Sequence, residues 1–414
     1  MKLDKYSFGT GDRFGRQGEA QLAAVRKAAG QGAEIAIVWN KSHREHMIVG
    51  TNPQDVRREA DRAIQAAGWK GSYHVDADHI GLGNVDQFLE PSDFFTIDVA
   101  DFIGEKAGDE DIVNYLNRMR SSIGALQIDG ITDPIQVDSD FLRSVAEKYL
   151  FAIQQAARIY QYIANKKGVD TFITEVSLDE TDEAQTPSEL YFILGAIAHC
   201  RIPAQTIAPK FSGRFNKGVD YQGDVTRFNR EFSDDVCVVS EAIRSFGLQA
   251  NLKLSVHSGS DKFLIYQGIR DALKKFDVGV HVKTAGTTWL EELIGLAESG
   301  GDAQAMVVTI YQRACERFDE LCGPYHSVID IDRAKLPSPE AVANWSSDDL
   351  VQAIRHDQSC AGYNSNIRQL FHVAYKIAAE MEDRYLDALK DHGEAIGRNV
   401  CDNLFERHIR PLFL

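Results

Sequence analysis

The segment Leu252–Thr284, LKLSVHSGSDKFLIYQGIRDALKKFDVGVHVKT, decides the fold. Two short β-rich runs, LKLSVH and VGVHVK, flank one amphipathic helix. Polar residues follow each run, with His257 to Lys262 after the first and His281 and Lys283 at the end of the second. Strands joined through a helix run parallel, so these polar groups should arrive at the same end of neighbouring strands.

Six further β-rich runs along the chain are similar to these two. The eight predicted strands span residues 6–9, 35–39, 72–75, 94–97, 171–175, 204–208, 252–256 and 279–282. Helical segments lie between most of them. This alternation predicts a parallel sheet covered by helices, and eight units favour closure into a (β/α)8 TIM-type barrel in the α/β class. An open doubly wound sheet is the alternative, because the first and fourth runs are the weakest.

The predicted domain organisation follows from where this alternation stops. Residues 1–300 should form the barrel catalytic domain, and residues 301–414 a C-terminal helical extension packed on it. An acidic, irregular stretch at about 99–140 interrupts the pattern. We interpret that stretch as an insertion, or as a lid over the site.

Bulk composition limits the partners that the protein is expected to have. The net charge of −16 disfavours nucleic acid and anionic membranes. The N-terminus has no apolar signal segment, and no apolar run approaches the length of a membrane span. Six cysteines without a CxxC pair are typical of free thiols in a reducing cytoplasm. We expect a cytoplasmic protein that takes a small molecule, and a homo-oligomer is compatible with this composition.

Three histidines are candidate metal ligands. His79, His257 and His281 each stand at or just after a strand end, and a barrel gathers its catalytic groups at the C-terminal ends of its strands. Three imidazoles with one open position would make a catalytic metal site. Asp76, Asp78 or Glu175 could replace one histidine. The structural alternative is that some of these histidines are only hydrogen-bonded inside the barrel.

Two carboxylates are candidates for proton transfer. Asp78 is adjacent to His79, and Glu175 ends the apolar run TFITE. Burial there should desolvate Glu175 and raise its pKa, which would suit proton transfer near neutrality. The alternative for Glu175 is a salt bridge to Lys210 or Lys283. The acidic segment 179–183 is interpreted as a solvated loop, with a second metal site as the alternative.

Cationic and turn residues at the same strand ends predict an anion-binding function. In a protein of net charge −16, such clustering indicates a carboxylate or phosphate on the substrate. The predicted substrate-binding residues are Arg13, Lys41, Lys210, Ser258, Lys262 and Lys283. Arg13 lies in a glycine-rich turn that matches neither a Walker loop nor GxGxxG.

Long ordered motifs between residue 6 and about residue 290 resemble the tagaturonate epimerase family. They are GTGDRFG (9–15), WNKS (39–42), DADHI (76–80), EVS with DET and QTP (175–187), APKF with GRF (208–215), VDYQGD (219–224), HSGSDK (257–262) and HVKTAGT (281–287). The resemblance implies a TIM-type barrel that interconverts D-tagaturonate and D-fructuronate.

The resemblance also implies a divalent metal cofactor, such as Mn, Zn, Fe, Co or Ni, held by His79, His257 and His281. Asp78 and Glu175 are then the expected catalytic pair. The inverted carbon is β to the ketone, so enolisation alone cannot epimerise it. Retro-aldol cleavage with re-addition is one route, and transient oxidation by a bound NAD is another, for which no Rossmann fingerprint is present. The alternatives are a metal-dependent aldolase or ketose isomerase, and a non-catalytic protein that binds sugar acids.

Overall fold

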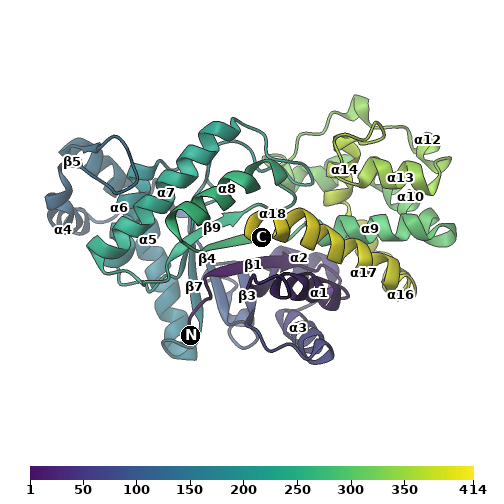
Figure 1. Cartoon of the computed structure of the whole chain (residues 1–414), viewed down its shortest axis with the longest axis horizontal. Coiled ribbons are helices and arrows are strands. Elements are labelled where there is room, and N and C mark those ends of the chain that lie inside the picture. The colour runs from purple at the N-terminus through teal and green to yellow at the C-terminus, as the bar shows by residue number, and fades with distance from the viewer.

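The computed structural model describes all residues, 1–414, and its centre is a closed barrel of eight parallel strands (Figure 1). These strands are β1 (Tyr6–Gly11), β2 (Ala36–Ser42), β3 (Tyr73–Ile80), β4 (Phe94–Asp98), β7 (Ile173–Ser177), β8 (Thr206–Ala208), β9 (Lys253–His257) and β10 (Val280–Thr284). They follow one another around the barrel in chain order, and β10 pairs with β1 to close it. All eight predicted strands and the (β/α)8 barrel are confirmed, and the open sheet is excluded.

The barrel interior changes from apolar to polar along the strands. A small apolar cluster of Leu3, Ala36, Val38, Phe94 and Ile173 fills the N-terminal end. Residues two apart on a strand share a face and lie about 7 Å apart along it. The next layer, two residues further along the strands from Val38, Phe94 and Ile173, therefore consists of Asn40, Thr96 and Glu175. This gradient puts polar groups at the C-terminal mouth.

Helices cover the outside of the barrel. They are α1 (Gly18–Ala29), α2 (His43–Val49), α3 (Pro53–Ala67), α5 (Ser139–Lys167), α6 (Pro187–His199), α7 (Val225–Phe246), α8 (Phe263–Phe276) and α9 (Thr287–Ser299). The sequence Thr186-Pro-Ser-Glu189 begins α6 as a reciprocal capping box with proline in the first turn. None of the helices combines the length and the hydropathy that a membrane span requires.

The predicted insertion lies outside the barrel. It contains α4 (Asp109–Met119) and an antiparallel hairpin of β5 (Gly124–Leu126) and β6 (Ile135–Val137). The α4 side chain Tyr115 donates a hydrogen bond of 2.7 Å to the carbonyl of Phe192 on α6. The helix α4 packs against α5 and α6 (Figure 1). The segment is therefore not placed as a lid over the mouth.

The C-terminal region begins as a separate group of helices and then returns to the barrel. The group comprises α10 (Gly301–Glu316), α11 (Phe318–Cys322), α12 (Pro339–Ala343), α13 (Ser347–Ile354), α14 (Ser365–Val373), α15 (Tyr375–Ala379) and α16 (Asp383–Asp391). The chain then runs back through α17 (Gly393–Asp402), a π-helix (Asn403–Ile409) and α18 (Arg410–Phe413). These last elements pack against α1 and α8 (Figure 1). The end of the chain thus completes the helical layer of the barrel. A domain boundary at residue 300 would assign these last helices to a different domain from the barrel that they cover.

A buried ionic cluster joins the barrel mouth to these C-terminal helices. The carboxylate of Asp261, in the loop after β9, lies 2.6 Å from Nη2 of Arg368 on α14. The same carboxylate lies 3.1 Å from Nδ1 of His356 and 3.0 Å from Nε2 of His408 in the π-helix. All four side chains are almost fully buried. Burial alone would raise the pKa of Asp261, but the charge of Arg368 and the histidine hydrogen bonds hold it well below its usual value.

Replacing Arg368 with methionine is expected to destabilise the protein by about 3–5 kcal/mol, because removing one partner leaves the other charge buried and unpaired. Urea denaturation followed by circular dichroism measures this change. The matched control is Arg398→Met, since Arg398 is an exposed partner of Glu298 and should contribute less than about 1 kcal/mol. Equal stability losses in both variants would contradict a structural role for the cluster.

Candidate active site

The polar end of the barrel is organised around the ammonium group of Lys283. Its Nζ lies 2.8 Å from Oδ2 of Asp76, 2.8 Å from Oδ1 of Asp78 and 3.3 Å from Oε1 of Glu175. It also donates a hydrogen bond of 2.8 Å to the hydroxyl of Thr96. Strand β3 contributes two of these residues, and β4, β7 and β10 contribute one each. One buried lysine thus holds three carboxylates together.

His257 links this group of side chains to the β7 loop. Its Nε2 lies 2.8 Å from Oε1 of Glu175, and its Nδ1 lies 3.1 Å from Oδ2 of Asp179. The Nδ1 atom is buried, and its approach to Asp179 does not have the geometry of a hydrogen bond. Burial lowers the pKa of His257, but the charges of Asp179 and Glu175 outweigh this effect and raise it to about 9. The ring therefore lies where positive charge is favoured.

His79 has a strained backbone. Its φ is 52°, in the left-handed region, and the pairing of β3 with β4 shifts register between Ala77 and Ile80. Such a conformation in a residue other than glycine costs about 1–3 kcal/mol and is concentrated at functional sites. The bulge turns the ring so that Nδ1 lies 2.9 Å from Oδ2 of Asp98 and Nε2 lies 3.7 Å from Oδ1 of Asp78. The ring of His79 lies edge-on to that of His257, with centroids 5.3 Å apart.

The residues present fit a divalent metal ion. One ligand atom from each of His79, His257 and Asp179 lies within 4.8 Å of the others. Each histidine gives its other nitrogen to a carboxylate, His257 to Glu175 and His79 to Asp98. Metal-binding histidines are commonly oriented in this way. A second group, His79, Asp98 and Glu180, has similar spacing and shares one histidine with the first.

His281 lies apart from this candidate metal group. It stands two residues before Lys283 on the same strand face, so it is about one layer deeper in the barrel. Its Nδ1 lies 3.0 Å from the hydroxyl of Ser7, and its ring packs on Phe94 with centroids 5.3 Å apart. Burial lowers its pKa to about 3. Asp179, and not His281, is the third member of the candidate metal group. The interpretation of segment 179–183 as a solvated loop is wrong for Asp179, whose carboxylate lies 3.1 Å from Nδ1 of His257.

The prediction of a raised pKa for Glu175 is also wrong. Burial raises its pKa, but the charge of Lys283 and the contact with His257 outweigh burial and hold it well below its usual value. The salt bridge to Lys283, given above as the alternative, is present. Among the three carboxylates, Asp76 is the one whose pKa rises, to about 6, because burial exceeds the effect of Lys283. Asp78 keeps a lowered pKa, since Lys283 and His79 outweigh its burial.

Several predicted substrate-binding groups make internal contacts. Lys41 donates to the carbonyl of Arg13 at 2.6 Å and to the hydroxyl of Thr51 at 2.8 Å. The hydroxyl of Ser258 donates to the carbonyl of Lys283 at 2.9 Å. The amino group of Lys283 is occupied by the carboxylates described above. Lys210, partly exposed on the loop after β8, is fixed through its backbone, which exchanges hydrogen bonds with Gln185.

The glycine-rich turn after β1 carries its own anion. The carboxylate of Asp12 accepts hydrogen bonds from the backbone N–H groups of Phe14, Gly15 and Gln17. Those donors are therefore not free for a phosphate. Arg13 remains at the mouth, with Nε 3.0 Å from Oε1 of Glu45 and its guanidinium stacked 4.0 Å over the ring of Tyr375.

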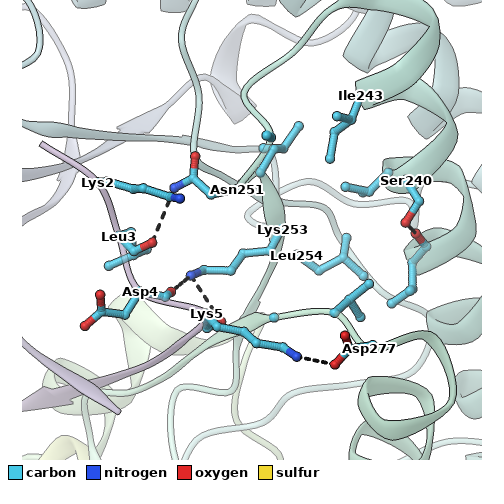
Figure 2. A pocket seen from close by; sticks show the side chains of 16 residues that line it. Lys2, Leu3, Asp4, Lys5, Ser240, Ile243, Asn251, Lys253, Leu254 and Asp277 are labelled. Atoms are coloured by element: carbon cyan, nitrogen blue, oxygen red, sulfur yellow. Dashed lines mark hydrogen bonds and ion pairs between the residues drawn. The ribbon is translucent and has the colours of Figure 1, made fainter. Parts of the chain in front are cut away.

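A cavity of about 670 Å³ lies at the opposite end of the barrel (Figure 2). It is lined by residues before β1, by the C-terminal part of α7 and by the start of β9. Lys253 points into it and donates to the carbonyls of Asp4 and Lys5. Catalytic function in barrels of this class belongs to the C-terminal face, whereas this face contributes to stability. The cavity is therefore not the candidate active site.

The fold and this site define an enzyme of the (β/α)8-barrel class, with its chemistry at the C-terminal mouth. Comparison with known proteins gives the family. The chain belongs to the tagaturonate epimerase family, whose model matches residues 1–409. It is 29% identical over 416 residues to the tagaturonate/fructuronate epimerase of Thermotoga maritima, with 97% of this chain and 80% of that protein covered.

Solved structures support the fold. The crystal structure of a fructuronate-tagaturonate epimerase from Cohnella laeviribosi with one glycerol superposes with a TM-score of 0.82 at 23% identity, covering 100% of this chain and 82% of that chain. The form with two glycerols gives a TM-score of 0.83 at 22% identity with the same coverage. The resemblance to the tagaturonate epimerase family that the sequence motifs indicated is confirmed, and the protein is an enzyme.

Proposed function

We propose that the protein interconverts D-tagaturonate and D-fructuronate with the help of a divalent metal ion. The observation that supports a metal ion is the convergence of His79, His257 and Asp179, with each imidazole oriented by a carboxylate. The charges agree with it. Five carboxylates gather at the mouth: Asp76, Asp78 and Glu175 lie against Lys283, Asp98 lies against His79, and Asp179 lies against His257. Additional positive charge therefore stabilises the site.

The ion would act as a Lewis acid toward the substrate ketone. The protein groups supply orientation and proton transfer. Asp78 lies beside His79 and is the best-placed base for the hydroxyl on the carbon to be inverted. Loss of that proton allows the bond between this carbon and its neighbour next to the ketone to break, which gives an aldehyde and an enolate. Rotation of the aldehyde, attack by the enolate and return of the proton form the epimer, with all atoms conserved.

Glu175 has a different part in this proposal from the one predicted from the sequence. Its Oε1 is shared among Lys283, Thr96 and His257, and the side chain is fully buried. It therefore positions His257 and balances Lys283. We assign proton transfer to Asp78 and orientation to Glu175.

Incubation of the enzyme with D-tagaturonate in the presence of Mn²⁺ is expected to give D-fructuronate, detected by NMR. Chelation should lower the rate by at least about 100-fold, since several kcal/mol of charge stabilisation are lost, and added metal should restore it. Three-carbon fragments would indicate an aldolase, and an aldose product would indicate an isomerase. Binding without turnover would indicate a sugar-acid binding protein. Full activity of metal-free enzyme would contradict the metal assignment.

Deuterium at the inverted carbon separates the two chemical routes. Retro-aldol cleavage leaves the C–H bond of that carbon intact, so only a small secondary isotope effect on kcat/KM is expected. Oxidation by a bound nicotinamide breaks this bond and gives a large primary effect. Exchange of the deuterium with solvent would exclude both routes.

A further inference from the structure

A second polar cluster lies where the barrel loops meet the C-terminal helices, and the chemistry described above does not use it. It consists of Lys217 in the loop after β8, Lys262 after β9, Arg13 after β1 and His372 on α14. Nη1 of Arg13 donates to the backbone carbonyl of His372 at 3.2 Å, and a Cβ atom on Gly218, the neighbour of Lys217, would lie 3.3 Å from the Cβ of His372. Burial and the charges of Arg13, Lys217 and Lys262 hold the pKa of His372 well below its usual value. In a chain of net charge −16, the gathering of three cations around one ring requires an explanation.

His372 is buried and unpartnered. The side chain is 1% exposed, and neither ring nitrogen has a hydrogen-bond partner. A buried polar group without a partner costs about 1–3 kcal/mol. The ring is held against the mouth, because a Cβ atom on Gly286, just after β10, would collide with Nε2 of His372. Only glycine leaves room for the imidazole at this strand end.

The two lysines of the cluster lack a carboxylate partner of their own. Lys262 is fully buried and donates only to the hydroxyl of Ser260 at 3.1 Å and the carbonyl of Asp261 at 3.2 Å. Lys217 is partly exposed, and its Nζ lies 5.5 Å above the ring of Tyr325. Ser260 also accepts from the backbone N–H of Gly218 at 2.9 Å, which fixes the two loops to each other.

This cationic cluster is adjacent to the candidate metal group. His372 lies against Gly286, and the N–H of Gly286 donates at 2.9 Å to the carbonyl of Gly259, two residues after His257 of the metal group. A single elongated molecule can therefore contact both. A keto sugar acid has its ketone near one end of a six-carbon chain and its carboxylate at the other, which matches an acidic, metal-binding end and a cationic end.

We propose that Lys217, Lys262, Arg13 and His372 bind the carboxylate of the substrate, and so select sugar acids over neutral ketoses. The proposal rests on the function proposed above. Lys217 and Lys262 supply charge, and neutral His372 supplies one N–H donor. The helix α14 and Tyr325 thus contribute to substrate selection, although they lie outside the eight strand–helix units.

The test compares a uronate with the neutral ketohexose that carries a hydroxymethyl group in place of the carboxylate. Lys217→Met is expected to lower kcat/KM for D-tagaturonate by about 10–100-fold, the value of a charged hydrogen bond. Turnover of D-tagatose should change by less than about threefold, and Lys217→Arg should recover part of the loss for the uronate. Lys335→Met is the matched control, since Lys335 is exposed and pairs with Asp332.

Equal losses on both substrates, or no loss on either, would overturn the proposal. Thermal melting of each variant shows that it is folded.

If the wild-type enzyme converts neither substrate, the proposed function fails, and calorimetry still tests the subsite. The six-carbon aldonate D-altronate has the carboxylate and no ketone, and D-altritol lacks both. Preferential binding of altronate that Lys217→Met and His372→Asn abolish would support the subsite, and equal binding of both compounds would exclude it.

Discussion

Replacing Lys283 with methionine is expected to lower kcat/KM by at least about 100–1,000-fold, the effect of losing one preorganised electrostatic group. The same change should destabilise the fold by about 3–5 kcal/mol, because Asp76, Asp78 and Glu175 would share a buried space without their common cation. Steady-state kinetics and urea denaturation measure the two effects. Lys274→Met, on the exposed face of α8, is the matched control.

The destabilisation should depend on pH in a defined direction. The pKa of Asp76 is already raised to about 6 by burial, with Lys283 in place. Without Lys283, the pKa of this carboxyl in the folded state rises further above its unfolded value. A carboxyl of this kind favours folding at low pH, and that contribution is lost as pH rises from the unfolded pKa to the folded pKa. The stability gap between wild type and Lys283→Met should therefore be larger at pH 8 than at pH 5.

A double substitution separates charge from packing. In Lys283→Met/Asp76→Asn, one buried carboxylate is replaced by a neutral group of the same shape. This protein should be more stable than Lys283→Met alone, although Asp76→Asn in the wild type removes an ion pair. The two effects should not be additive, because the residues are in direct contact. Strict additivity would contradict the view that unpaired charge dominates the loss.

The strands were predictable because their signal is local. Runs such as Glu34–Asn40 are apolar on both faces, and only a strand between two layers requires that. The polar residues after the strands then placed Asp78, His79, His257 and Lys283 at one rim, because parallel strands end together. The same reasoning could not find the return of the last helices to the barrel, since amphipathic helices do not reveal which neighbour they contact.

The site was predicted less completely because depth and long-range partners are not local properties. His281 and Lys283 share one strand face and differ by one layer, so the sequence alone places both of them at the mouth. Lys283 has the pattern of an anion-binding residue, yet its partners come from β3, β4 and β7. His372 lies on α14, far beyond Thr284 at the end of the last barrel strand, and only the close approach to Gly286 brings it to the mouth.

Asp179 was recognisable only in part. The run ITEVSLDE places it two residues beyond the end of β7, where barrels commonly carry functional groups. Its neighbours Glu180, Asp182 and Glu183 gave the segment the composition of a solvated loop. The approach to His257 across the mouth is what distinguishes it, and that approach joins residues from β7 and β9.

Replacing Asp179 with asparagine is expected to weaken metal binding by about 100-fold or more, because loss of an outer partner of a metal ligand already costs about 10–100-fold. The activity should fall with metal occupancy. Metal content after dialysis and titration with Mn²⁺ measure the affinity directly. Asp182→Asn removes an exposed carboxylate from the same loop, so it is the matched control and should bind metal as the wild type does.

His281→Phe completes this test, because it distinguishes the observed geometry from the ligand set predicted from the sequence. Phenylalanine can pack on Phe94 as the imidazole does. The substitution removes the hydrogen-bond partner of the Ser7 hydroxyl, but this change lies one layer below the candidate ligands. Metal stoichiometry should therefore stay at the wild-type level in His281→Phe and fall in Asp179→Asn. The reverse pattern in two folded variants would show that His281 is a ligand and that Asp179 only orients His257.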